Sequence, residues 1–204
     1  MSVPHQRGFT LLEVMVTVAI LGIALALAGQ SFTQATHRAR VKNAAEGLRG
    51  RLEFARSLAM AAGPRLGTPQ FRNCVNGLGP NGNDLEVTID PGTNSYIVPV
   101  ALQYAGGGPT GGQFVDSICQ AFSIADSAES NGIGQVEVNG GGAPVNLVFT
   151  GTGRLDALTP GPIFVRVIDP TYTSRAPGLR ILPSGVICKS TDPAGVGCDE
   201  DAPP

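Results

Sequence analysis

The chain has 204 residues, among them 28 glycines and 16 prolines but no tryptophan, and only 15% are charged. This length suits one domain with an accessory segment, and so many turn-forming residues favour a loop-rich β domain over a helix bundle. Residues 1–56 carry seven Lys/Arg against three Asp/Glu (net +4), whereas residues 57–204 carry seven against thirteen (net −6). The acidic larger part argues against indiscriminate binding to nucleic acid, which depends on neutralising phosphates.

The first element is a nearly uninterrupted apolar run over residues 9–28, with one carboxylate at Glu13. A helix of about 20 apolar residues can span a bilayer, and a carboxylate at that depth is costly without a partner. A secretory signal peptide fits poorly, because its shorter apolar region ends in small residues at the cleavage site. Here the small residue, Gly8, precedes the run. The alternative is a plain signal anchor in which the glutamate occurs by chance.

The stretch Gly8-Phe9-Thr-Leu-Leu-Glu13 resembles the class III leader of type IV prepilins and type II secretion pseudopilins. The resemblance implies that a prepilin peptidase cuts after Gly8, removes the leader peptide 1–8 and methylates the new N-terminal Phe9. It also implies that Glu13 neutralises the Phe9 amine of the next subunit during assembly. Electrostatics agrees, because a charge in apolar surroundings needs a partner of opposite sign or loses its charge. We therefore expect residues 9–36 to form a transmembrane helix that later becomes the core of a fibre.

The helical pattern continues beyond the apolar run. Apolar residues recur at steps of three and four over residues 41–62, and charged residues occupy the opposite face. Two oppositely charged pairs are spaced i,i+4 on that face: Lys42 with Glu46 and Arg49 with Glu53. The Gly63-Pro64 pair predicts the end of the helix. Residues 37–62 are therefore expected to form an amphipathic half that carries a domain, in one helix roughly 80 Å long from Phe9 to Ala62.

Short β-like runs separated by turn-forming residues fill the rest of the chain. The expected strands are 85–89, 96–104, 118–124, 136–138, 145–149, 163–168, 179–182 and 186–188. We expect them to form an antiparallel sheet on the apolar stripe of the helix, so that residues 65–204 make one β-rich globular domain. The predicted fold class is α+β with a pilin-like fold. Residues 105–117 and 190–204 are expected to be loop or tail.

Three further stretches narrow the resemblance. The end of the predicted helix resembles the corresponding stretch of the GspH/FimT family of minor pilins and pseudopilins, at residues 52–60 (Leu-Glu-Phe-Ala-Arg-Ser-Leu-Ala-Met). The C-terminal strand pair of that family is similar to residues 145–154 (Val-Asn-Leu-Val-Phe-Thr-Gly-Thr-Gly-Arg) and 179–188 (Leu-Arg-Ile-Leu-Pro-Ser-Gly-Val-Ile-Cys). A cysteine-bearing C-terminal loop is more typical of its type IV pilus members than of its secretion members.

All four cysteines follow the apolar run: Cys74, Cys119, Cys188 and Cys198. An even number in one compartment indicates disulfides and an oxidising space such as the periplasm. Three pairings are possible. We favour Cys188–Cys198, across a Gly/Pro/Asp-rich loop, with Cys74–Cys119 as the remainder. Zinc is the alternative, but no Cys-x2-Cys pair exists and His5 and His37 lie far away in sequence.

Positive charge flanks both ends of the apolar run, with Arg7 before it and Arg38, Arg40 and Lys42 after it. Lys and Arg normally mark the cytoplasmic side, so this rule alone does not decide the orientation. The cysteines favour a periplasmic domain.

Catalytic chemistry is not indicated. Two histidines leave no Ser-His-Asp or Cys-His site, and the glycine clusters lack the Gly-x4-Gly-Lys-Ser/Thr pattern of a phosphate loop. We expect no enzyme and no cofactor. Four oxygen-bearing residues could hold calcium: Asn81, Asn83, Asp84 and Glu86. Their spacing does not match an EF-hand, and an Asn/Gly turn before a strand explains them more simply.

The sequence therefore predicts a minor pilin of the priming or tip complex of a type IV pilus, supporting assembly and motility or adhesion. It would first be a single-pass inner-membrane protein and then part of the surface fibre. The expected partners are prepilin peptidase and, through the N-terminal helix, other minor and major pilins. The alternatives are a minor pseudopilin of type II secretion and a pilus-borne DNA receptor for natural transformation.

DNA binding would need a local basic patch. Four residues could supply one: Arg166, Arg175, Arg180 and Lys189. The simpler interpretation is that they are solvent-facing positions on strands and turns. The acidic end Asp199-Glu200-Asp201 would repel phosphate, so nucleic acid is not the expected ligand.

Overall fold

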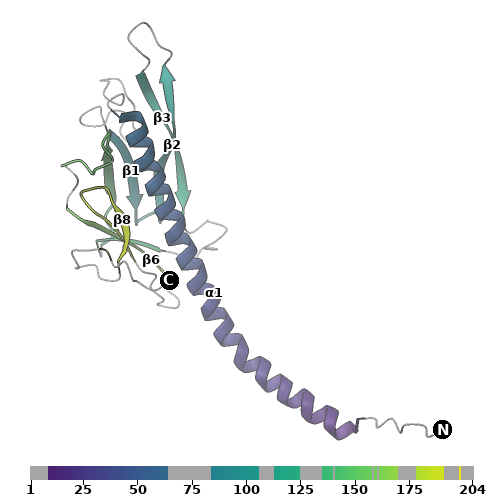
Figure 1. Cartoon of the computed structure of the whole chain (residues 1–204). Helices are drawn as coiled ribbons and strands as arrows, with labels where there is room; N and C mark the ends of the chain where they lie inside the picture. The colour runs from purple at the N-terminus through teal and green to yellow at the C-terminus, as the bar shows by residue number, and fades with distance from the viewer. Residues whose placement is uncertain are drawn as a thin grey trace.

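The computed structural model describes residues 9–63, 84–105, 113–124, 135–139, 141–157, 159, 161–169, 178–190 and 198, without the side chains of residues 27–31, 84, 103–105 and 113–117. One long helix dominates it, and the C-terminal half of this helix lies against a β domain while the N-terminal half extends away (Figure 1).

Helix α1 runs over Leu11–Ala62 without a break. It begins at Thr10, an extended residue that acts as the N-cap, and so starts two residues after the expected Phe9. It ends at Gly63, whose positive φ of 51° is accessible to a residue without Cβ and whose backbone N–H donates to the carbonyl of Ala59. The prediction of one continuous helix ending at residue 62 is confirmed.

The described strands form two antiparallel four-stranded sheets. The first has the order β3-β2-β1-β5 and contains β1 (Asp84–Asp90), β2 (Ser95–Ala105), β3 (Gln113–Ser123) and β5 (Val145–Thr150). The second has the order β4-β6-β7-β8 and contains β4 (Gln135–Val138), β6 (Ile163–Ile168), β7 (Gly178–Ile181) and β8 (Ile187–Ser190). The α+β class and a pilin-like helix packed on antiparallel strands are confirmed.

The structure differs from the expected single sheet, because the strands divide into two. Strand β4 lies between β3 and β5 in the sequence, yet it pairs with β6. An alternating pattern shows which face of a strand is buried but not which strand is its neighbour. Strand β3 also begins five residues earlier than expected, since Phe114 already pairs with Tyr104 of β2, so residues 113–117 are strand and not loop.

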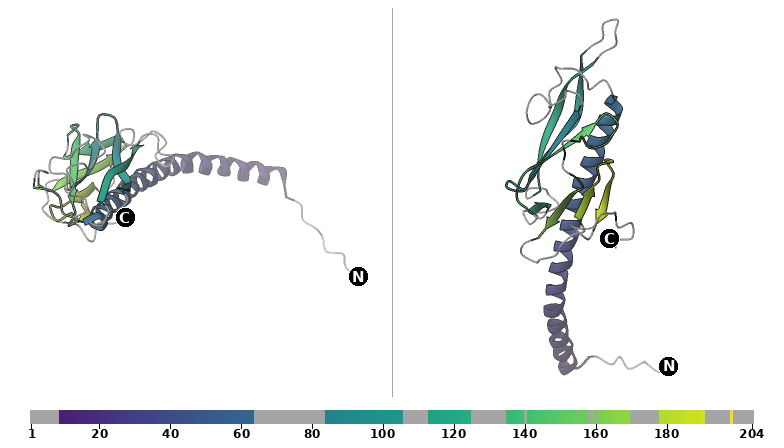
Figure 2. Two further views of the ribbon diagram at one scale, coloured as in Figure 1. Left: turned by 90° about the horizontal axis from the view of Figure 1, so that it is seen from above. Right: turned by 90° about the vertical axis from the view of Figure 1, so that its left-hand side faces the viewer.

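The apolar stripe of α1 forms the centre of the core. Its buried residues are Val41, Ala44, Ala45, Leu48, Leu52, Ala55, Ala59 and Ala62. Leu48 and Leu52 are fully buried, and the small alanines around them let the helix approach the strands closely. The helix contacts β1, β2 and β5 of the first sheet and β6, β7 and β8 of the second. Figure 2 shows the described strands gathered around the C-terminal half of α1, with the N-terminal half bare.

Two asparagines with positive φ tie the elements together. Asn94, in the β1–β2 turn, accepts a hydrogen bond on its side-chain oxygen from the backbone N–H of Val136 in β4, at 3.0 Å. Asn139 accepts from the backbone N–H of Phe164 in β6, at 2.8 Å. Asparagine tolerates this backbone conformation because its short side chain replaces a backbone partner. The first contact joins the two sheets through an edge strand.

Two tight turns meet on the distal end of α1. The Arg56 Nε donates to the carbonyl of Gly153 at 2.9 Å. Gly153 and Gly185 both have positive φ, of 75° and 78°. A Cβ on Gly185 would lie 1.8 Å from the carbonyl oxygen of Gly153. Glycine is therefore required at residue 185, where the β7–β8 turn presses on the turn after β5.

We predict that Gly185→Ala lowers the free energy of unfolding by about 2–4 kcal/mol, from positive-φ strain and the backbone clash together. The measurement is urea unfolding of the full chain in mild detergent, followed by circular dichroism. Gly50→Ala is the matched control, because Gly50 is exposed within α1 and its Cβ would meet nothing within 4 Å. That change should be neutral or stabilising by up to about 1 kcal/mol. Equal stabilities for Gly185→Ala and the wild type would contradict the role of the turn contact.

A buried carboxyl predicts a pH dependence of stability. Glu86 of β1 is 4% exposed, and burial raises its pKa above the ordinary value. The native state therefore holds this proton more tightly than the unfolded chain, so stability falls as the pH rises through the raised pKa. Relative to the wild type, Glu86→Gln should gain stability as the pH rises from the ordinary carboxyl range through the raised pKa of Glu86. Thermal melts across that range test it, and a constant difference between the two proteins would contradict it.

Candidate functional site

The N-terminal half of α1 presents a continuous apolar surface to its surroundings. Eleven large apolar side chains there are half or more exposed: Phe9, Leu11, Leu12, Val14, Met15, Val16, Val18, Ile20, Leu21, Ile23 and Leu25. We call residues 9–26 the apolar segment. Soluble monomers seldom expose so large an apolar area, which marks a surface made for contact. In the part of the chain that the structure describes, no helix is long and apolar enough to cross a membrane.

One charged group lies within the apolar segment. The carboxylate of Glu13 is exposed in the first helical turn, where the helix dipole favours negative charge. Phe9, Glu13, Val14 and Thr17 together line a shallow depression. The structure therefore brings together Phe9 and Glu13, two of the three residues predicted at the leader boundary, and Gly8 lies outside the described residues.

Backbone capping fixes the start of the helix beside this carboxylate. The Thr10 hydroxyl accepts from the backbone N–H of Glu13 at 3.3 Å, and the Thr17 hydroxyl donates to the carbonyl of Val14 at 2.9 Å. Both threonine hydroxyls thus have partners inside the helix. Glu13 is left as the group of this depression that can bind an external cation, such as an amine.

The C-terminal disulfide favoured from the sequence is present. Cys188 of β8 and Cys198 are bonded, with their Cα atoms 5.6 Å apart. Cys119 of β3 is also disulfide-bonded. Cys74, the remaining cysteine of the sequence, lies outside the described residues.

Metal ligands do not converge in the described part of the chain, where no three His, Cys, Asp or Glu side chains gather. Asn81 and Asn83 of the calcium hypothesis lie outside the described residues. Asp84 is the first residue of β1, and Glu86 is a buried residue of the same strand.

The basic residues considered for DNA that lie in the described part of the chain do not form an exposed patch. Arg166 and Arg180 are 9% and 2% exposed, which corrects the expectation that they face solvent. Their guanidinium carbons lie 5.0 and 5.9 Å from the ring centroid of Phe164, which accounts for part of this burial. Lys189 is ion-paired with Glu46 of α1, and Arg175 lies outside the described residues.

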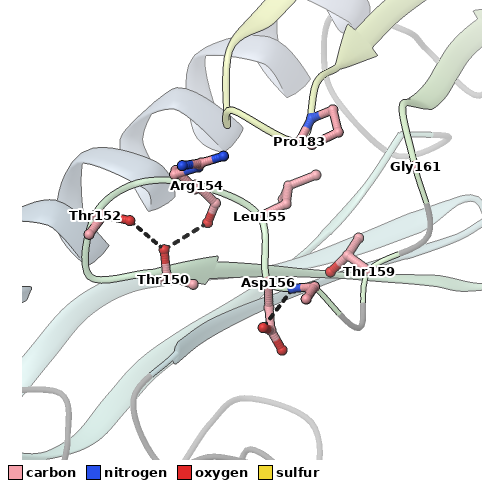
Figure 3. Close-up of a pocket in the computed structure, with 9 residues that line it drawn as sticks. Thr150, Thr152, Arg154, Leu155, Asp156, Thr159, Gly161 and Pro183 are labelled. Carbon is pink, nitrogen blue, oxygen red and sulfur yellow. Dashed lines mark hydrogen bonds between the residues drawn. The ribbon is translucent and has the colours of Figure 1, made fainter.

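An open pocket of about 520 Å³ lies between the turn after β5 and the turn after β7 (Figure 3). The Thr150 hydroxyl is bonded there to the Thr152 hydroxyl and to the carbonyl of Arg154, and Asp156 accepts from the backbone N–H of Ala157. These hydrogen bonds hold the turn that follows β5. Among the described residues that line the pocket, no nucleophile is paired with a base.

A side-chain contact between His37 and Asp169 was not predicted from the sequence. His37 Nδ1 of α1 lies 2.8 Å from Asp169 Oδ2, and the Asp169 side chain is fully buried at the end of β6. The two residues are 132 positions apart, so no local pattern could reveal the contact. It fixes the second sheet to the helix just where the helix leaves the domain.

The N-terminal part of the chain matches a known sequence motif. Residues 4–29 match the family model described as the prokaryotic N-terminal methylation motif. This match supports a type IV pilin-like protein, with membrane anchoring, processing by prepilin peptidase and assembly with other pilus components. No curated protein and no solved structure matches the chain.

We predict that Thr10→Ala loosens the first turn of α1. Loss of the N-cap hydroxyl should cost about 1 kcal/mol locally and speed amide exchange at Glu13 about fivefold. Hydrogen exchange measured by NMR in detergent micelles tests this. Thr17→Ala is the control, because the Thr17 hydroxyl donates to carbonyls already bonded within the helix. Equal exchange rates at Glu13 in wild type and Thr10→Ala would contradict the capping role.

Proposed function

We propose that this chain is a minor pilin of the GspH/FimT type, incorporated into a type IV pilus through its N-terminal helix. The observation that carries the proposal is the coincidence of the methylation motif at residues 4–29 with the exposed apolar segment. An exposed apolar helix needs cover, which a bilayer supplies before assembly and neighbouring helices supply afterwards. The β domain needs no such cover, because its core residues are buried between the strands and α1.

Glu13 gives this assembly its specificity. Cleavage after Gly8 frees the amine of Phe9, two residues before the helix begins. Once water is excluded, an unpaired Glu13 carboxylate is unfavourable, and so is an unpaired amine. A neighbouring subunit whose amine meets Glu13 satisfies both charges, so the apolar segment packs in one register. The capped first turn holds Glu13 ready for this contact.

The β domain supports the pilus assignment within the family. The bridged Cys188–Cys198 loop belongs to the C-terminal region that resembles the pilus members. Such a disulfide suits a domain exposed first to the periplasm and then at the cell surface. We assign the subunit to the priming or tip complex, where it supports assembly and pilus-dependent motility or adhesion. The buried Arg166 and Arg180 and the paired Lys189 give no support to the DNA-receptor alternative.

We predict that Glu13→Ala is cleaved normally after Gly8 but enters fibres at least about tenfold less, because removing one partner leaves a buried charge uncompensated. Mass spectrometry of the membrane fraction measures cleavage, and immunoblots of sheared fibres measure incorporation. Glu53→Ala removes another exposed carboxylate of α1, one that pairs with Arg49 inside the domain half, and should leave incorporation unchanged. Normal incorporation of Glu13→Ala, or intact Met1 in assembled fibres, would contradict the proposal.

A further inference from the structure

Three cations stand on α1 over residues 38–42, where the β domain begins to cover the helix. Arg38 is exposed, and Arg40 and Lys42 are half-buried. We call these three residues the basic collar. They surround Val41, the first residue of the buried stripe. Arg38 and Lys42, spaced i,i+4, lie on one side of the helix and Arg40 lies on the other, in the turn where the domain begins.

The collar has no acidic partner within the described residues. Lys42 was expected to pair with Glu46, but Glu46 instead pairs with Lys189 of β8. The other nearby acid, Asp169, is taken by His37. Within the described part of the chain, these three cations therefore remain available to an anionic group from outside the molecule.

The height of the collar places it beside a bilayer surface. The apolar run ends in sequence at Ala28, so Arg38 lies ten residues, or roughly 15 Å, further along the helix. The headgroup layer is about 5–8 Å thick, and charges act in salt over about 8–10 Å. Arg38 and its long side chain thus reach the outer edge of the phosphates when residues 9–28 fill the hydrocarbon layer.

We propose that the basic collar binds the headgroups of anionic phospholipids and gathers these lipids around the helix in the leaflet on the domain side. The inference rests on the proposed function, because it takes the apolar segment as inserted in a bilayer. Each Lys or Arg side chain near an anionic membrane surface raises the affinity of the protein for that surface by about fivefold. The collar thus holds the unassembled subunit at a fixed height, and it releases the lipids when the helix moves into a fibre.

The test uses tryptophan quenching in reconstituted vesicles of the full chain, which contains no tryptophan. Leu25→Trp places a reporter at an exposed position near the collar end of the apolar run. Vesicles are phosphatidylcholine with a minor fraction of phosphatidylglycerol, and either lipid is brominated in its acyl chains. Brominated phosphatidylglycerol should quench about fivefold more than its bulk fraction predicts. The excess should disappear in the triple variant Arg38→Gln, Arg40→Gln, Lys42→Gln and at 1 M salt.

Matched controls separate the possible failures. Leu12→Trp reports on the opposite leaflet, so its quenching should not respond to the triple variant. Arg154→Gln removes an exposed cation far from the collar and should leave the excess quenching by brominated phosphatidylglycerol unchanged. No excess in the wild type, or an excess that survives the triple variant, would overturn the collar proposal. Competition by inorganic phosphate beyond that of sodium chloride at equal ionic strength would overturn the lipid in favour of a free-anion site. Failure of brominated phosphatidylcholine to quench Leu25→Trp would instead overturn the membrane insertion on which the proposed function depends.

Discussion

The structure depends on the contact between the apolar stripe of α1 and two sheets at once. Eight residues of the stripe are buried: Leu48 and Leu52 lie next to each other at its centre, and the other six are five alanines and Val41. Both sheets contact this helix, which closes the described core from one side. The same helix is uncovered over its first half, so one continuous element serves as the centre of a domain and as an exposed apolar surface. This division explains how a domain with its own buried core shares one helix with an apolar segment that needs other apolar groups to cover it.

Contacts around the helix keep the domain from shifting along it. His37 with Asp169 fixes the membrane-side end, Lys189 with Glu46 fixes the middle, and Arg56 with Gly153 fixes the distal end. Each contact joins α1 to a different part of the β domain. The exposed members of these pairs contribute little to stability individually, but their spacing along the axis defines one register between helix and sheets.

The sequence predicted the elements that local chemistry determines. The end of α1 followed from Gly63-Pro64, and all eight strands lie near their expected positions because alternation and turn residues act over short distances. The division into two sheets was not predictable, since Asn94 and Val136 are brought together only by the fold. The burial of Arg166 and Arg180 was also missed, because arginine on a strand usually faces water, whereas here both guanidiniums lie against Phe164. Phe9 and Glu13 could be predicted as site residues because their signal is contiguous in sequence, whereas the His37–Asp169 contact has no local signal.

The geometry of the buried stripe also determines how the molecule responds to mechanical load. Helix α1 is one unbroken rod, so a pull on its N-terminal end acts along the axis and is transmitted directly to the domain. The stripe and its three flanking contacts are loaded in parallel under such a pull, and they must yield together in shear. Lys189 pairs with Glu46, so β8 is tied to the same helix that carries the load. A subunit built in this way withstands tension along a fibre better than a force applied across it.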